Sequence, residues 1–161
     1  MTSEQSELDN KIMLKQVQGV NQFLTFIMAD EEYGVDILTV QEIRSWEEIT
    51  VIPNAPDYVK GVINLRGTIV PILDLRLRFG LTGIEYGSLT VVIVVKVVFA
   101  QKSKIMGIVV DAVSDVYSIV EQDAKMVPNF GDSENSEFVA GLVNVGNKMV
   151  ALLDLKKTMD I

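Results

Sequence analysis

Most of the chain after residue 20 consists of short segments rich in apolar residues. In some of these segments apolar and polar residues alternate, and in others the apolar residues are consecutive. This pattern is typical of β-strands. The segment ADEE, residues 29–32, separates two such blocks and predicts a hairpin between strands at about 21–28 and 31–37. Further strands are expected at about 41–52, 61–66, 68–74, 89–98, 105–112, 114–120, 138–145 and 148–153.

Few segments have the spacing of a helix. Short helices are expected at 55–60, 75–79 and 155–160. Residues 1–18 lack a clear apolar face before Ile12 and are expected to form a flexible tail. The pattern as a whole therefore predicts a mainly β protein with many short strands.

The chain contains an internal repeat. Residues 61–80 align without a gap with residues 141–160, and six of the 20 positions are identical. Further upstream, GVDILTVQEIRS parallels GIVVDAVSDVYS, and VIPN parallels MVPN, in the same order. The repeat predicts a single domain over 19–161, made of two similar β units at about 33–80 and 106–160. Whether the two units exchange strands is left open by the sequence.

Several residues of the repeat have simple structural interpretations. Asp74 and Asp154 each stand where a strand is expected to end and a helix to begin, so we expect both to cap helices. Asn64 recurs as Asn144, which suggests that its side chain ties a turn. Arg66 has Gly146 as its counterpart. We therefore expect Arg66 either to pair with Glu42 as a structural tie or to form part of an interaction surface, and the two roles are compatible.

Composition and charge limit the classes of function and partner to be considered. Apolar residues make up 48% of the chain and the mean hydropathy is +0.30, enough for a substantial core. The net charge is −8 and no basic run is present, which argues against nucleic acid as a partner. The polar start and the longest apolar stretch, which is interrupted by Lys96, predict a soluble, cytoplasmic protein without membrane insertion.

The residue types also argue against catalysis. The chain has neither Cys nor His, so it lacks thiolate nucleophiles, the usual zinc ligands and the commonest proton-transfer group. Asp30, Glu31 and Glu32 match no Ca²⁺ loop and are expected to form a solvated hairpin tip. We expect no catalytic residues, metal or cofactor. A carboxylate-based hydrolase is an alternative for which the sequence offers no matched acid and base.

Residues 30–80 closely resemble the CheW family of chemotaxis coupling proteins, through the motifs YGVDI, VQEI, PDYVKGVINLRG and VPILDLR. GIVVDAVSDV and GLVNVGNKMVALLDL resemble the second half of the family. The resemblance implies two five-stranded β-barrel subdomains of the Src-homology-3 type around a shared hydrophobic core. It also implies a noncatalytic adaptor, monomeric in isolation, that couples the cytoplasmic tips of methyl-accepting chemoreceptors to the histidine kinase CheA.

The resemblance further implies site residues. The receptor-binding residues carried over are Ile37, Val40, Glu42, Ile43, Arg66, Val113 and Val116. The kinase-binding residues carried over are Gly61, Ile69, Val91 and Gly107. Trp46 could belong to the core or anchor an interface. A paralogous coupling protein of another chemosensory system and a generic ligand-binding β-barrel are the alternative functions.

Overall fold

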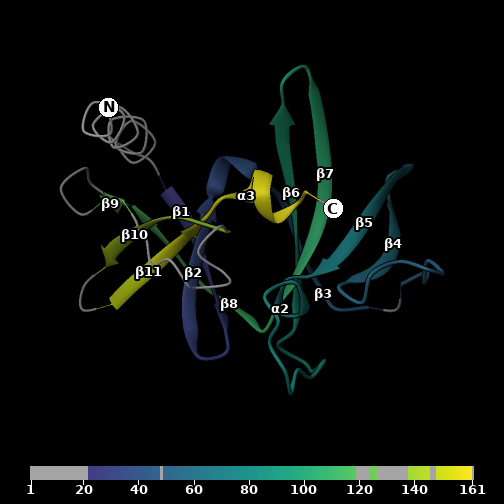
Figure 1. Ribbon diagram of the computed structural model, residues 1–161, viewed down its shortest axis with the longest axis horizontal. Helices are drawn as coiled ribbons and strands as arrows, with labels where there is room; N and C mark the ends of the chain where they lie inside the picture. The colour runs from purple at the N-terminus through teal and green to yellow at the C-terminus, as the bar shows by residue number, and fades with distance from the viewer. Residues whose placement is uncertain (1–21, 48, 119–123, 127–137, 146–147, 161) are drawn as a thin grey trace.

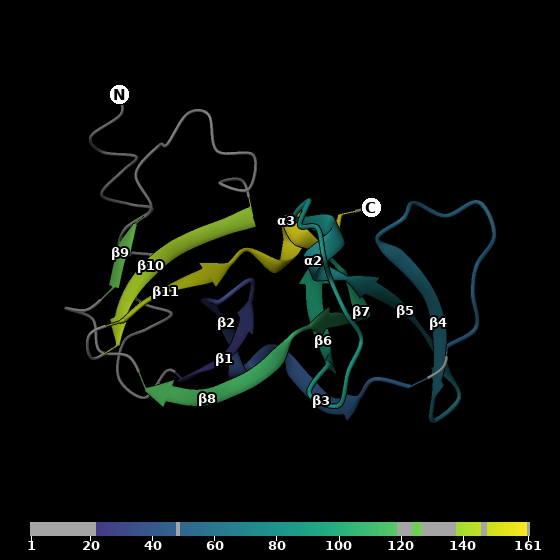
Figure 2. The ribbon, with the colours of Figure 1, turned by 90° about the horizontal axis from the view of Figure 1, so that it is seen from below.

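The computed structural model describes residues 22–47, 49–118, 124–126, 138–145 and 148–160, which form two β-sheets with short helices between them (Figures 1 and 2). Sheet A has the strand order β8 (Ala112–Ser118), β1 (Gln22–Met28), β2 (Glu31–Asp36), β11 (Lys148–Leu153), β10 (Val139–Val145) and β9 (Ala124–Met126). Sheet B has the order β3 (Val40–Ser45), β6 (Val91–Phe99), β7 (Lys102–Val110), β5 (Thr68–Asp74) and β4 (Val59–Leu65). The short helices are η1 (Ile37–Thr39), α2 (Leu75–Arg78) and α3 (Leu155–Thr158).

The two sheets exchange strands between the sequence repeats. The β1–β2 hairpin pairs with β8 on one side and, in parallel, with β11 on the other. The β6–β7 hairpin pairs in the same way with β3 and, in parallel, with β5. Sheet B is therefore built from one continuous stretch, whereas sheet A joins the first described strands to the last.

Matched glycines allow the parallel pairings. Gly61 and Gly107 both lie opposite Ile72, in neighbouring strands of sheet B. Their counterparts Gly141 and Gly34 both lie opposite Leu152 in sheet A. A β-bulge precedes Gly61 and Gly141 alike. The repeated glycines thus belong to the architecture of both halves.

A shared core lies between the sheets because their central strands bury both faces. Leu24, Phe26 and Met28 of β1 and alternate residues of β6, such as Ile93 and Val95, belong to one buried cluster. The opposite face of β6 packs inside sheet B, where Val92 and Val94 belong to a separate cluster. Burial on two faces explains why these strands have nearly continuous apolar runs.

Most of the strand predictions agree with this architecture, and the mainly β fold class is confirmed. The hairpin at 29–32 is confirmed by the β1–β2 register. Sheet A has one strand more than expected, because the three-residue β9 was not predicted. The 3₁₀ turn η1 was not predicted either.

Two local predictions were wrong. The helix expected at 55–60 is a turn, in which Val59 N–H bonds Pro56 C=O at 2.9 Å before β4 begins. The strand expected over 41–52 ends at Ser45, and only Thr50 of its last residues makes a bridge, to Val62. In both segments the chain crosses between strands of sheet B, a tertiary requirement that the local pattern does not contain.

The polar residues of the repeat have the structural roles predicted for them. The Asp74 carboxylate accepts the Arg76 N–H at the start of α2, and the Asp154 carboxylate accepts the Lys157 N–H at the start of α3. The Asn64 side chain accepts the Gly67 N–H at 2.7 Å, which ties the β4–β5 turn. The turn that follows Asn144 and the tail predicted over residues 1–18 lie outside the described residues.

Candidate functional site

Two strands carry most of the predicted receptor-binding residues, and both lie at sheet edges. β3 ends the strand order of sheet B, and β8 ends that of sheet A. In Figure 2 both strands lie along the lower side of the molecule. Edge strands offer unpaired backbone groups and side chains to other proteins. The edges are thus where an adaptor could bind its partners.

Within these strands, side chains alternate between the core and the surface. Ile37, Val40 and Val113 are half-buried and pack against the shared core. Ile43 and Val116, which are counterparts in the repeat, are 44% and 41% exposed. Some of the apolar residues predicted to bind the receptor therefore pack against the core, and others face the solvent. Leu38, next to Ile37 in η1, is 80% exposed and was missed, because a single apolar residue in a turn carries no periodic signal.

Arg66 and Glu42 form the predicted ion pair. Arg66 Nη2 lies 3.6 Å from Glu42 Oε2, and the Arg66 side chain is 80% exposed. A bidentate ion pair, the geometry that arginine favours with a carboxylate, is absent from this pair: it makes one contact, at a distance too long for a hydrogen bond. Because the Arg66 side chain lies mostly in solvent and makes a single long contact, the pair contributes at most about 1 kcal/mol to stability. The pair is consequently a weak structural tie that leaves most of the guanidinium accessible.

The backbone at Arg66 adds a second argument for an external role. Arg66 has a φ of 51° and Gly67 a φ of 89°, so both residues of the two-residue turn are left-handed. Asn and Gly are the usual residues of such turns, and a longer side chain there costs roughly 1 kcal/mol. An arginine in this position destabilises the turn that it occupies, which favours a role beyond the fold.

The four predicted kinase-binding residues occupy different environments. Ile69 is 61% exposed on β5, and Val91 is half-buried at the start of β6. Gly61 and Gly107 are buried beside Ile72. Any contribution of the two glycines to kinase binding must come through the strands that they position, whereas Ile69 is accessible to a partner.

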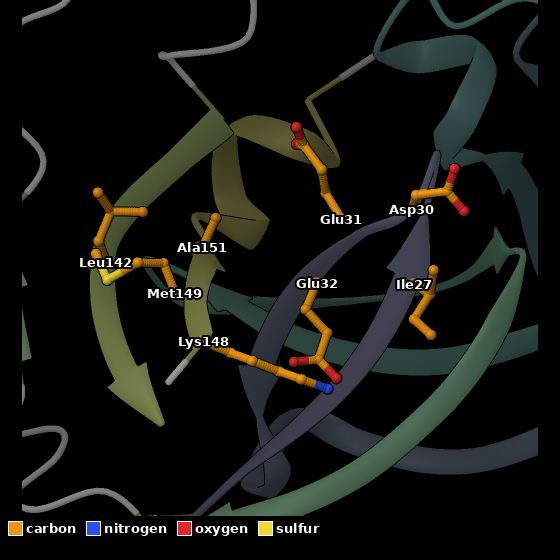
Figure 3. Close-up of a pocket in the computed structure, with 8 residues that line it drawn as sticks. All are labelled: Ile27, Asp30, Glu31, Glu32, Leu142, Lys148, Met149 and Ala151. Carbon is orange, nitrogen blue, oxygen red and sulfur yellow. The ribbon is translucent and has the colours of Figure 1, made fainter. Parts of the chain in front are cut away.

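The counterpart of Ile69 in the second half borders an open pocket. Met149 is 49% exposed and lines a pocket of about 540 Å³ together with Leu142, Ala151 and acidic residues of the β1–β2 turn (Figure 3). Figure 3 shows the Lys148 side chain extending toward Glu32. The acidic residues Asp30, Glu31 and Glu32 at the tip of the β1–β2 hairpin thus also line this pocket. The repeat alignment was the signal that could have singled out Met149.

Tyr33 lies near this turn. Its hydroxyl donates a hydrogen bond to Glu31 at 3.2 Å. Burial, together with the negative charge of Glu31, raises the pKa of Tyr33 to about 12. The phenol is therefore neutral at physiological pH and acts as a hydrogen-bond donor.

Asp74, one of the two carboxylates that could suggest catalysis, is fully occupied by structural contacts. It is buried and bonded to the guanidinium of Arg76 through both oxygens. Asp154 caps α3. The two carboxylates thus have the capping roles predicted from the repeat. No helix in the described part of the chain is long and apolar enough to span a bilayer.

Comparisons with known proteins identify the family of the chain. A family model described as "CheW-like domain" matches residues 22–161. The chain is 46% identical over 138 residues to the chemotaxis protein CheW of Klebsiella aerogenes, covering 86% of this chain and 81% of that protein. It is 36% identical over 137 residues to the chemotaxis protein CheW of Rhizobium meliloti, covering 85% and 86%.

A solved structure matches as well. The crystal structure of the scaffolding protein TtCheW from Thermoanaerobacter tengcongensis superposes with a TM-score of 0.79 at 31% sequence identity. The superposition covers 89% of this chain and 94% of that one. The fold, the family match and the relatives agree over nearly the whole described length: the chain belongs to the CheW-like family.

Proposed function

We propose that this protein is a noncatalytic chemotaxis adaptor that couples methyl-accepting chemoreceptors to the histidine kinase CheA. The observation that carries the proposal is the 46% identity to a chemotaxis protein CheW over 86% of the chain. An adaptor needs accessible surfaces for at least two partners, and exposed apolar residues on both sheets supply candidates. The proposed location is the cytoplasm, at receptor arrays.

The receptor surface that we propose consists of the exposed parts of β3 and β8 with the β4–β5 turn. Ile43 and Val116 would supply apolar contacts to one face of a receptor helix. Arg66 would supply a charge at the rim, where Glu42 holds it near β3. The strained backbone at Arg66 supports this role, since the second half has glycine at the corresponding position.

Arg66→Asn is expected to weaken binding of a receptor-tip fragment by about tenfold, which corresponds to 1.4 kcal/mol. Stability should be unchanged or slightly higher, because asparagine tolerates the left-handed φ of 51° better than arginine does. Isothermal titration calorimetry and thermal unfolding measure the two effects. Lys102→Asn, at the β6–β7 hairpin, is the control. Intact binding with a large loss of stability would contradict the proposed role of Arg66.

The kinase surface that we propose is centred on Ile69. This side chain lies 61% exposed, on a strand whose neighbours keep it in a fixed position. Apolar side chains at the centre of an interface contribute most of its binding energy. The family resemblance also implies that the regulatory domain of CheA has a related fold, which would place a similar sheet opposite Ile69.

Ile69→Glu is expected to weaken binding of the CheA regulatory domain by about 30-fold or more, because a charge would be buried in an apolar contact. The midpoint of thermal unfolding should stay near that of the unsubstituted protein, since Ile69 is mostly exposed. Leu89→Glu, at a residue 72% exposed elsewhere on the surface, is the matched control. Equal losses of affinity in both variants would exclude a specific role for Ile69.

The proposal as a whole is tested by measuring binding of the unsubstituted protein to the CheA regulatory domain and to a receptor-tip fragment. Affinities in the nanomolar to micromolar range are expected for interfaces of standard size. A folded protein that binds neither partner would contradict the adaptor function. Binding to both partners of a different chemosensory system, and not of the main chemotaxis system, would identify a paralogous coupling protein.

A further inference from the structure

One buried arginine connects four parts of the chain. Arg76 on α2 is 1% exposed and pairs with both carboxylate oxygens of Asp74, at 2.9 Å from Nε and 2.8 Å from Nη2. Its Nη1 donates to the Glu85 carbonyl at 2.8 Å and to Asp111 Oδ1 at 2.9 Å. The centroid of the Tyr86 ring lies 4.8 Å from the guanidinium carbon. The charge of Arg76 is therefore compensated on several sides, as a buried charge requires.

This environment strongly favours the charged state. Burial alone would lower the pKa of Arg76, but its hydrogen bonds to Asp74 and Asp111 and their negative charges raise it above the ordinary value. Burial and the hydrogen bond to Asp74 likewise raise the pKa of Tyr86, whose hydroxyl lies 2.5 Å from Asp74 Oδ2. At physiological pH the Arg76 guanidinium is therefore charged and the Tyr86 phenol is neutral.

Residues 81–90, here called the strap, connect this network to the end of β3. The strap runs from α2 toward β3 (Figure 2). The Tyr86 ring stacks on the Trp46 ring, with ring centroids 4.5 Å apart, and the backbone N–H of Trp46 donates to the Thr90 carbonyl at 3.1 Å. Trp46 also packs against the interior cluster of sheet B, in agreement with the core alternative for this residue. The strap is thereby held in its middle through Tyr86 and at its last residue through Thr90.

Asp111 connects the network to sheet A. It lies between β7 and β8, where the chain leaves sheet B and enters sheet A. Its Oδ2 accepts the Ala29 N–H at 3.0 Å, and its own N–H donates to the Ile27 carbonyl at 3.1 Å, so it holds the β1–β2 turn. A chain of charge-assisted hydrogen bonds therefore runs from sheet B through Arg76 to sheet A.

The second half of the chain has no comparable arginine. Lys156 is the counterpart of Arg76 and is exposed. Among the described residues, no ion pair involves Asp154, the counterpart of Asp74. The repeated fold can thus form its strand–helix junction without such a network. The network of Asp74, Arg76 and Asp111 must therefore have a role that is specific to the first half.

We propose that Asp74, Arg76 and Asp111 form an ion-pair tie that fixes the orientation of sheet A relative to sheet B. Apolar packing in the shared core is non-directional and tolerates several similar arrangements. Bidentate and charge-assisted hydrogen bonds have defined geometry and select one of them. The tie thereby determines how the edge strands β3 and β8 are presented together. The importance of presenting β3 and β8 together rests on the proposed function, whereas the tie between the sheets does not.

The test uses Asp111→Ala, which removes both acceptors that join Arg76 to Ala29. The Asp111 side chain is 39% exposed and Arg76 keeps Asp74, so the variant should fold. Because the chain contains no cysteine, nitroxide labels can be placed at Thr68→Cys on sheet B and Met149→Cys on sheet A, both exposed. Pulsed electron resonance then gives the distribution of distances between the sheets in the isolated protein.

We expect Asp111→Ala to broaden this distribution and to add a second distance. Amide hydrogen exchange at Ala29 should accelerate by about tenfold or more, because its acceptor is lost. Asp154→Ala, which removes a helix cap without touching the tie, should leave both measurements unchanged. An unchanged distribution in folded Asp111→Ala would overturn the proposal, and so would equal broadening in Asp154→Ala. Neither measurement involves a receptor or kinase, so the outcome is independent of the adaptor function.

Discussion

Asp74→Ala is expected to lower the free energy of unfolding by about 3–5 kcal/mol. The substitution leaves the Arg76 guanidinium, which is 1% exposed, without the carboxylate that pairs with two of its nitrogens. It also removes the cap of α2 and the acceptor of the Tyr86 hydroxyl. A buried charge that loses its partner costs far more than an exposed pair would contribute. Urea unfolding followed by circular dichroism measures the change.

The repeat supplies a matched control for this experiment. Asp154→Ala removes the corresponding cap of α3, and Asp154 is only half-buried. A lost cap costs about 1 kcal/mol. Similar losses in both variants would mean that Asp74 acts only as a cap and that the pairing with Arg76 contributes little to stability.

Gly61→Ala is expected to destabilise the protein by about 2–5 kcal/mol. A Cβ atom at this position would lie 2.0 Å from the Thr50 carbonyl oxygen, a backbone atom that cannot rotate away. The φ of 150° is also unfavourable for any residue with a side chain. The contact lies where the Thr50 bridge closes on β4, so the expected damage is loss of that pairing. Thermal unfolding measures it.

Gly87→Ala is the control for this second prediction. Gly87 lies in the strap, its φ is ordinary, and a Cβ atom there would meet no neighbour within 4 Å. We expect a change within about 0.5 kcal/mol, as for most surface substitutions. A neutral Gly61→Ala variant would show that the segment around Thr50 moves to accept the side chain.

The sequence predicted the parts of the fold that depend on local pattern. Alternating blocks predicted most strands, and the repeat predicted the two caps and the Asn64 turn. The CheW resemblance, later confirmed by the family match, identified the receptor-binding and kinase-binding candidates. The absence of Arg66 from the second copy indicated a role specific to the first half, and Glu42 on a neighbouring strand was the predicted partner.

Other features depend on contacts between distant residues, which no local pattern contains. Arg76 looks like an ordinary helix residue in LDLR, yet one of its partners, Asp111, is 35 positions away. The burial of Gly61 and Gly107 follows from their shared neighbour Ile72, and this neighbour is known only once the parallel strand order is known. The repeat alignment likewise could not predict which hairpins the two repeats exchange, because it shows which segments are similar and not which strands pair.

The exchange of hairpins has a consequence for biosynthesis. Sheet B is complete once residue 110 has been made, whereas the β1–β2 hairpin must wait for β8 and β11. At common rates of translation, the delay between residues 36 and 153 is on the order of ten seconds. Until residue 118 has been made, the hairpin QFLTFIM–EEYGVD has neither of its final sheet neighbours, and it lacks β11 until residue 153. The nascent chain therefore passes through a stage in which chaperone binding or pairing with another nascent chain competes with folding.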